Sequence, residues 1–111
     1  MAEKPKWQLG RLLEVSGDPA QQGEATELSA LPHFEVWVYG KPEMIPSWSL
    51  DDRTPLAARL RYQTNLRYEG RTLVVPADWI ELQPAIADEV AYVPYREWLT
   101  QQRRRRVRMG R

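Results

Sequence analysis

The sequence predicts a mainly β (or α+β) fold that ends in one helix and a basic tail. Three observations favour this fold class. Apolar and polar residues alternate over residues 60–69, which is the two-residue period of a half-exposed strand. Nine prolines are spread along the chain, and their spacing leaves room for strands and short helices but argues against an all-helical bundle. Residues 95–106 have a helix-forming composition that runs into a series of arginines.

Length and composition indicate a single domain. The 111 residues are 42% hydrophobic and 28% charged, which is ordinary for a globular protein. No apolar run approaches the roughly eighteen residues of a membrane-spanning helix, and the N-terminus lacks the apolar segment of a secretory signal. The absence of cysteine excludes disulfides and thiolate metal sites. We therefore expect a cytoplasmic protein with one β-rich domain, residues 1–102, and an arginine-rich arm, residues 103–111.

The first half of the chain predicts two strands separated by turn-rich segments. Residues 7–15 form the first expected strand, and the Gly- and Pro-rich residues 16–32 form a loop. In the next expected strand, residues 33–40, a phenylalanine and two valines alternate with Glu35, Trp37 and Tyr39. This pattern predicts a strand with one buried face and an aromatic opposite face. Residues 41–52 again have the composition of a turn.

The second half predicts a hairpin, a further strand and the helix. A short helical turn over residues 55–59 leads into the alternating strand, residues 60–69. Glu69 and Gly70 predict a tight turn into a return strand, residues 71–75, because glycine tolerates a positive φ angle. The remaining expected elements are a short strand (77–82), a connector (85–94) and the C-terminal helix (95–106).

The segment GRTLVVPADWIEL, residues 70–82, resembles the last part of Src-homology-three (SH3) domains. Those domains often end with a turn glycine, a strand, a proline six residues on, and then a small residue, Asn, Tyr, Val and Glu. The resemblance implies a small SH3-like curled β-barrel, or a curled sheet, of five to six strands. By the same resemblance, Pro76 and Trp79 match positions that help to line the family's groove for proline-rich peptides. The alternative is that Pro76 stops a strand and Trp79 caps the core.

No residue pattern points to an enzyme. The single histidine, His33, has no partners for a metal site, and we expect it at a strand edge. The carboxylate pairs Asp51–Asp52 and Asp88–Glu89 lie in turn-like segments where solvation is expected. No glycine-rich phosphate loop is present. The sequence therefore predicts no catalytic site, no cofactor and no metal.

The polar face of the alternating strand offers a possible basic surface. Arg59, Arg61 and Arg67 lie in phase with Gln63 and Asn65. Such a face could follow phosphates or stack on nucleobases. The alternative is a solvated face whose arginines pair with acids across the sheet.

The strongest signal is the charge of the arm. The arm holds six arginines and no acid, whereas the preceding 102 residues hold ten basic against fifteen acidic residues. Because the arginine guanidinium matches phosphate and carboxylate, an acidic protein surface, a nucleic acid or an anionic membrane are all possible partners. Mutual repulsion predicts an arm that is disordered until it binds. The arginines are Arg103, Arg104, Arg105, Arg106, Arg108 and Arg111.

Two hypotheses about function follow. The first is a non-enzymatic interaction or assembly module that docks into a larger complex, with its arm on an acidic partner. The high Trp and Tyr content supports it, and Trp37, Tyr39 and Trp79 are the candidate protein-binding aromatics. The alternative is a nucleic-acid-associated protein that uses the arm together with the strand arginines. A shared exposed surface of arm and strand arginines would favour the alternative.

Overall fold

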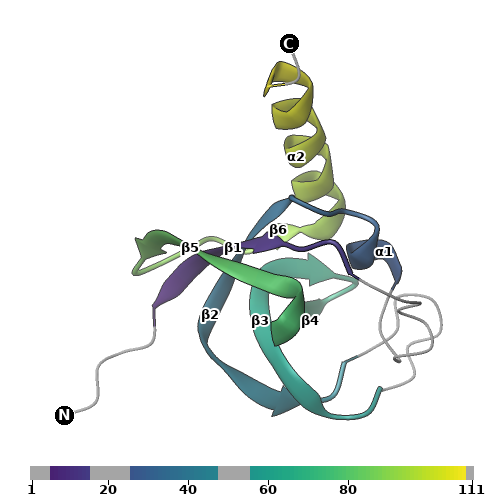
Figure 1. The fold of residues 1–111 in the computed structure, drawn as a ribbon, viewed down its shortest axis with the longest axis vertical. Helices are drawn as coiled ribbons and strands as arrows, with labels where there is room; N and C mark the ends of the chain where they lie inside the picture. Colours follow the sequence, from purple (N-terminus) through teal and green to yellow (C-terminus); the bar gives the residue numbers. More distant parts are fainter. Residues whose placement is uncertain (1–5, 16–25, 48–55, 110–111) are drawn as a thin grey trace.

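The computed structural model describes residues 6–15, 26–47 and 56–109. The chain forms a six-stranded sheet followed by one long helix, so the prediction of a mainly β fold with a C-terminal helix is confirmed (Figure 1). In chain order, the elements are β1 (Trp7–Leu12), α1 (Thr26–Ser29), β2 (Glu35–Ile45), β3 (Arg59–Tyr68), β4 (Arg71–Pro76), the 3-10 turn η2 (Ala77–Trp79), β5 (Ile80–Ala87), β6 (Val93–Pro94) and α2 (Tyr95–Met109).

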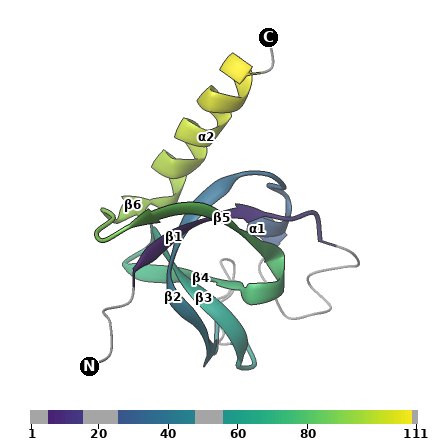
Figure 2. The same ribbon diagram turned by 60° about the vertical axis from the view of Figure 1, so that its left-hand side comes forward.

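The sheet is open, which corrects the expectation of a barrel. Its strand order is β4-β3-β2-β1-β5, with every neighbouring pair antiparallel, and the short β6 pairs parallel with β3. The two edge strands β4 and β5 are joined by η2 but form no ladder with each other. Strands β2 and β3 bend strongly, so the sheet curls around its core (Figures 1 and 2). Irregular pairing between these strands accompanies the bend, as bulges increase local twist.

The core lies inside the curl and is built by the predicted alternation in β2. Phe34, Val36 and Val38 are buried, whereas the residues between them lie on the outer face of the sheet. Leu28 of α1 also belongs to this core, and so do residues from β1, β3, β4, η2 and α2. The core therefore joins the helix to the sheet.

The hairpin between β3 and β4 is confirmed. Glu69 and Gly70 both have positive φ angles, 49° and 79°. A two-residue turn of this kind matches the right-handed twist of the flanking strands. Glycine suits the second position because it has no Cβ to clash with the backbone.

Several element bounds differ from the prediction. Strand β1 ends three residues early, and β2 continues past residue 40 to Ile45. Gly40 has a φ of 65° inside β2, at a break in the pairing with β3, so the residues that suggested a turn form a bulge. Residues 77–79 form η2 rather than the start of a strand. Strand β5 continues past residue 82 and into the expected connector, where it ends at Ala87. Residues 56–58, which were expected to be helical, are not.

In the described ranges, no helix is both long enough and apolar enough to cross a membrane.

Candidate partner-binding surface

The first half of α2 is anchored to the start of β2. Trp98 and Tyr95 are buried, and the Trp98 ring lies edge-on to Phe34 with 5.8 Å between centroids. Trp98 Nε1 donates a hydrogen bond to the backbone oxygen of Glu35 at 2.8 Å, and the Glu35 N–H donates to Gln102 Oε1 at 3.1 Å. Both backbone groups of one sheet residue are therefore held by the helix.

The anchoring residues follow the helical period. Tyr95, Trp98, Gln102 and Arg105 are spaced by three or four residues, so they lie on one face of α2. Arg105 ends this series with an ion pair to the Glu35 carboxylate, at 3.3 Å between Nη2 and Oε1. The composition of the sequence predicted the helix, but this spacing is the signal that identifies its docked face.

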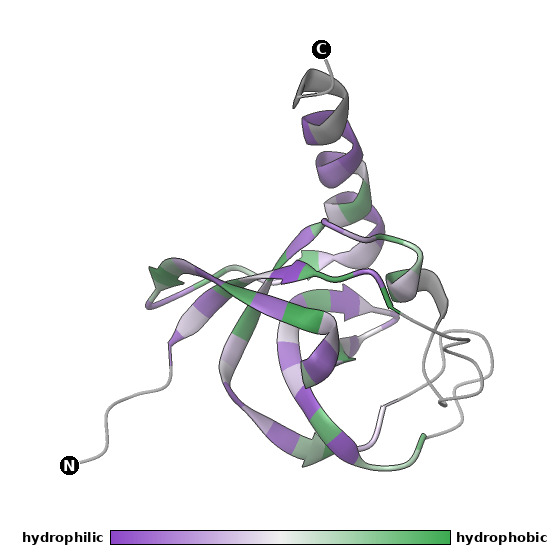
Figure 3. Cartoon of the chain, in the orientation of Figure 1, coloured by the Kyte–Doolittle hydropathy of each residue, from purple (hydrophilic) through white to green (hydrophobic). Residues whose placement is uncertain are grey.

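The C-terminal part of α2 projects away from the sheet (Figures 1 and 2). Arg103 and Arg104 are exposed, and a hydrophilic stretch follows the docked turns (Figure 3). The whole of α2 contains six arginines against one glutamate. Arg106 and Arg108 also lie on the helix, whereas Arg111 is outside the described residues.

The expectation of a disordered arm is wrong for the residues up to Met109, which are helical. Arginine is a good helix former, and cations are favoured at the C-terminus of a helix by its dipole. The costly first turn is provided by the docked half of α2, so the arm only extends an existing helix.

The strand arginines do not form one exposed basic face. Arg59 binds both oxygens of Asp78, at 2.9 and 3.0 Å. Arg61 is only 1% exposed, and its Nη1 donates to the backbone oxygens of Ile45 and Ala57. This corrects the prediction of an exposed position for Arg61.

Arg67 is exposed, but it covers a ring. Its guanidinium carbon lies 4.2 Å from the centroid of the Tyr92 ring, which is the geometry of a cation–π contact. The regular alternation expected for β3 also fails near its start, where Leu60 is 52% exposed. Because β3 bends, the two-residue period does not separate inside from outside along its whole length.

The candidate aromatic residues divide into two groups. Trp79 is 3% exposed and belongs to the core, so its prediction as a surface residue is wrong. Trp37 and Tyr39 lie on the outer face, which the sequence predicted as the aromatic face. Tyr39 contacts Trp7 across the β1–β2 ladder, with 4.9 Å between centroids.

A cleft of about 330 Å³ lies beside the docked half of α2. Its lining comes from the outer face of the sheet, from the segment before β6 and from α2. Leu9, Trp37 and Val93 provide apolar walls, and Arg105 of the arm also lines the cleft. Asn65 also lines this cleft and is only 5% exposed, which corrects its prediction as a residue of the exposed polar face.

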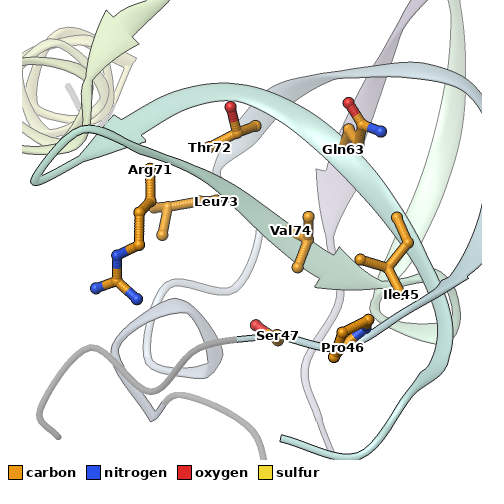
Figure 4. A pocket seen from close by; sticks show the side chains of 8 residues that line it. All are labelled: Ile45, Pro46, Ser47, Gln63, Arg71, Thr72, Leu73 and Val74. Carbon is orange, nitrogen blue, oxygen red and sulfur yellow. The ribbon is translucent and has the colours of Figure 1, made fainter. Parts of the chain in front are cut away.

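A second cleft of about 330 Å³ lies between β4 and the end of β2 (Figure 4). Ser47, Arg71 and Val74 are among the side chains around it. Residues 48–55, which include the carboxylate pair Asp51–Asp52, lie outside the described ranges.

The remaining titratable residues show no reactive cluster in the part of the chain that the structure describes. No group of three metal-ligating side chains occurs there. His33 lies in the turn before β2 with a φ of 70°, rather than at a strand edge. Asp88 lies 3.7 Å from the ammonium of Lys6 at the surface. The hydrogen bond from Arg11 lowers the pKa of Glu81 below its ordinary value of 4.5, and Gln83 adds to this effect.

Comparison of the chain with protein-family models, with curated proteins and with solved structures found no match. The case for a function therefore rests on the chemistry of this surface.

Proposed function

We propose that the protein is a non-enzymatic interaction module that docks into a larger complex by placing the projecting half of α2 on an acidic surface of a partner protein. One observation carries the proposal: a helix anchored in the core presents exposed arginines away from the sheet. An anchored helix holds these charges in a fixed direction, which lowers the entropy that binding has to overcome. The arginine guanidinium groups can then form paired hydrogen bonds with carboxylates of the partner.

Binding to nucleic acid is the alternative, and the strand arginines give it little support. Arg59 and Arg67 are engaged by Asp78 and Tyr92, and Arg61 is buried. The residues before the arm also carry more acids than bases. Phosphates would therefore find the densest row of described cations on the helix, whereas the net negative charge of the preceding residues disfavours their binding to the sheet.

The resemblance to SH3 domains supports a likeness of local fold rather than of ligand. Pro76, η2 and β5 follow the hairpin in the order that the resemblance implies. We infer that the curled sheet is an open form of such a small barrel. Since Trp79 is buried, it is not available to line a peptide groove.

The test compares two fluorescent probes of about equal charge, an oligoglutamate peptide and a single-stranded oligonucleotide. Binding is measured at increasing salt for the intact chain and for the variant Arg103→Ser/Arg104→Ser. We expect the intact chain to prefer the peptide and the variant to lose most of this binding. The matched control, Lys6→Ser/Lys41→Ser, removes the same charge from exposed positions on the sheet side.

Three results would overturn the proposal. The first is preferential binding of the oligonucleotide, with a logarithmic salt slope that falls by about 1.4 in the double arginine variant, since each contact to a single strand contributes about 0.7. The second is the absence of binding to either probe near physiological salt. The third is an equal loss of peptide binding in the control variant, which would mean that the helix has no special role.

A further inference from the structure

We propose that the cleft beside α2 is an anchor site for a tyrosine or tryptophan side chain of the acidic partner segment, with the ring's O–H or N–H donating to Asn65 Oδ1. This inference rests on the proposed function and specifies the partner's chemistry. It uses a site that the arginine helix alone does not require. Four features of the cleft lead to it.

The first feature is an unused acceptor on Asn65. Asn65 Nδ2 donates to the backbone oxygen of Ala91 at 3.1 Å, which fixes which end of the amide is the donor. Asn65 Oδ1 is buried, and no donor among the described residues bonds to it. Buried acceptors are rarely left without a donor, so a donor on a bound group would complete this site.

The second feature is a flat apolar wall next to that acceptor. Leu9 is opposite Trp37 in the β1–β2 ladder. Val38 is opposite Thr64 in the β2–β3 ladder, and this register places Trp37 beside Asn65. A ring that stacks on Trp37 would therefore bring its edge to the amide of Asn65.

The third feature is the size and polarity of the cleft. Its volume of about 330 Å³ is at the small end for ligand sites, so one ring system suits it better than a large cofactor. The indole N–H of Trp98 and the Oε1 of Gln102 are already engaged by the backbone of Glu35. Among the described side chains that line the cleft, Asn65 Oδ1 is the buried acceptor without a donor, so it is the atom on which discrimination between rings would depend.

The fourth feature is continuity with the arm. Arg105 lines the cleft and pairs with Glu35, yet its side chain is 59% exposed. The exposed Arg103 and Arg104 lie within one turn of it on the same helix. An acidic segment bound along α2 would therefore bring a neighbouring aromatic residue to the cleft, which is how interfaces combine a buried aromatic anchor with charged surroundings.

The test uses three fluorescent acidic peptides that differ at one central position, which is tyrosine, phenylalanine or alanine. We expect the wild-type protein to bind the tyrosine peptide about five- to tenfold more tightly than the phenylalanine peptide, the effect of one hydrogen bond. The variant Asn65→Leu should bind these two peptides equally. The matched control Gln101→Ala changes an exposed residue at the rim and should keep the difference.

A second variant keeps the test decisive if Asn65→Leu fails to fold. Ala91 is exposed and lines the cleft, so Ala91→Trp should fill the cleft without disturbing the core. This variant should bind all three peptides as weakly as the wild-type protein binds the alanine peptide. Its binding of oligoglutamate should be unchanged, because the arm is intact.

The outcomes separate this inference from the proposed function. If oligoglutamate binds and the aromatic residue adds nothing, the anchor site is wrong and the proposed function stands. If no acidic peptide binds, the proposed function itself fails. Two further results would show that the cleft binds a ring from a ligand other than an acidic peptide. One is binding of an oligonucleotide that is lost in Ala91→Trp. The other is binding of free p-cresol as tightly as the tyrosine peptide.

Discussion

The two halves of α2 have opposite surroundings. In the first half, Trp98 is buried in the core and the sheet residue Glu35 is held through both of its backbone groups. In the second half, exposed arginines follow one another and the helix projects from the molecule. Packing therefore stabilises one end of a continuous helix and leaves the arginines that follow it exposed.

The largest expected effect comes from breaking the anchored half. Trp98→Ala removes a buried ring and the hydrogen bond to the backbone of Glu35, so we expect a loss of about 3–5 kcal/mol in the free energy of unfolding. Urea denaturation followed by circular dichroism measures it. The exposed Thr100→Ala is the matched control on the same helix and should change stability by less than about 0.5 kcal/mol. Equal midpoints for Trp98→Ala and the wild type would show that the helix is not anchored by this ring.

Removing the projecting half should have a much smaller effect on stability. Among the described side chains, truncation after Gln102 removes the Arg105–Glu35 ion pair but no member of the core, so we expect a loss of at most about 1 kcal/mol. The same truncation should abolish binding to oligoglutamate. A loss as large as that of Trp98→Ala would mean that the arm belongs to the folded core.

The Arg105–Glu35 ion pair is expected to contribute less to the free energy of unfolding than the whole projecting half does. Glu35→Gln keeps the backbone hydrogen bonds that hold Trp98 and Gln102 but removes the carboxylate, so the expected cost is about 0.2–1 kcal/mol. A double-mutant cycle with Arg105→Gln isolates the interaction between the two side chains. Additive effects of the two substitutions would show that the pair does not couple the arm to the sheet.

The smallest expected effect is at a surface pair away from the helix, Arg11–Glu81, at 2.7 Å. Hydrogen bonding by Arg11 lowers the pKa of Glu81 from 4.5, so its contribution to stability is present above about pH 4.5 and is lost as the pH falls through the lowered value. Wild type and Glu81→Gln should therefore differ slightly at about pH 7 and converge in acid. A difference that grows in acid would contradict this assignment.

Features that depend on neighbours in the sequence were predictable. The turn at Glu69 and Gly70 follows from the freedom of glycine, and the alternation around Val36 identifies the buried face of β2. The helix was predictable from composition as far as Arg106, but its continuation to Met109 was not, because charge repulsion predicted a disordered arm. That continuation depends on tertiary contacts of Trp98 that composition does not reveal.

The buried polar residues were not predictable, because their partners are remote in the chain. Arg61 bonds to Ile45, and Asn65 bonds to Ala91. In a periodicity pattern, both residues count as exposed. The cleft beside α2 was not predicted for the same reason. Its lining comes from strands, from the segment before β6 and from α2, and these parts are brought together only by the fold.

The burial of Arg61 also has a consequence for how the chain can change. Its guanidinium bonds to Ile45 at the end of β2 and to Ala57 just before β3, and the Leu56 N–H donates to the Ser47 oxygen. These bonds fasten the two ends of the intervening segment to each other. Doubling the length of a loop between fixed ends costs only about 0.6 kcal/mol. Because these bonds lie outside residues 48–55, we expect extra sequence inserted between Ser47 and Leu56, even an epitope or a small domain, to leave the sheet and its helix intact.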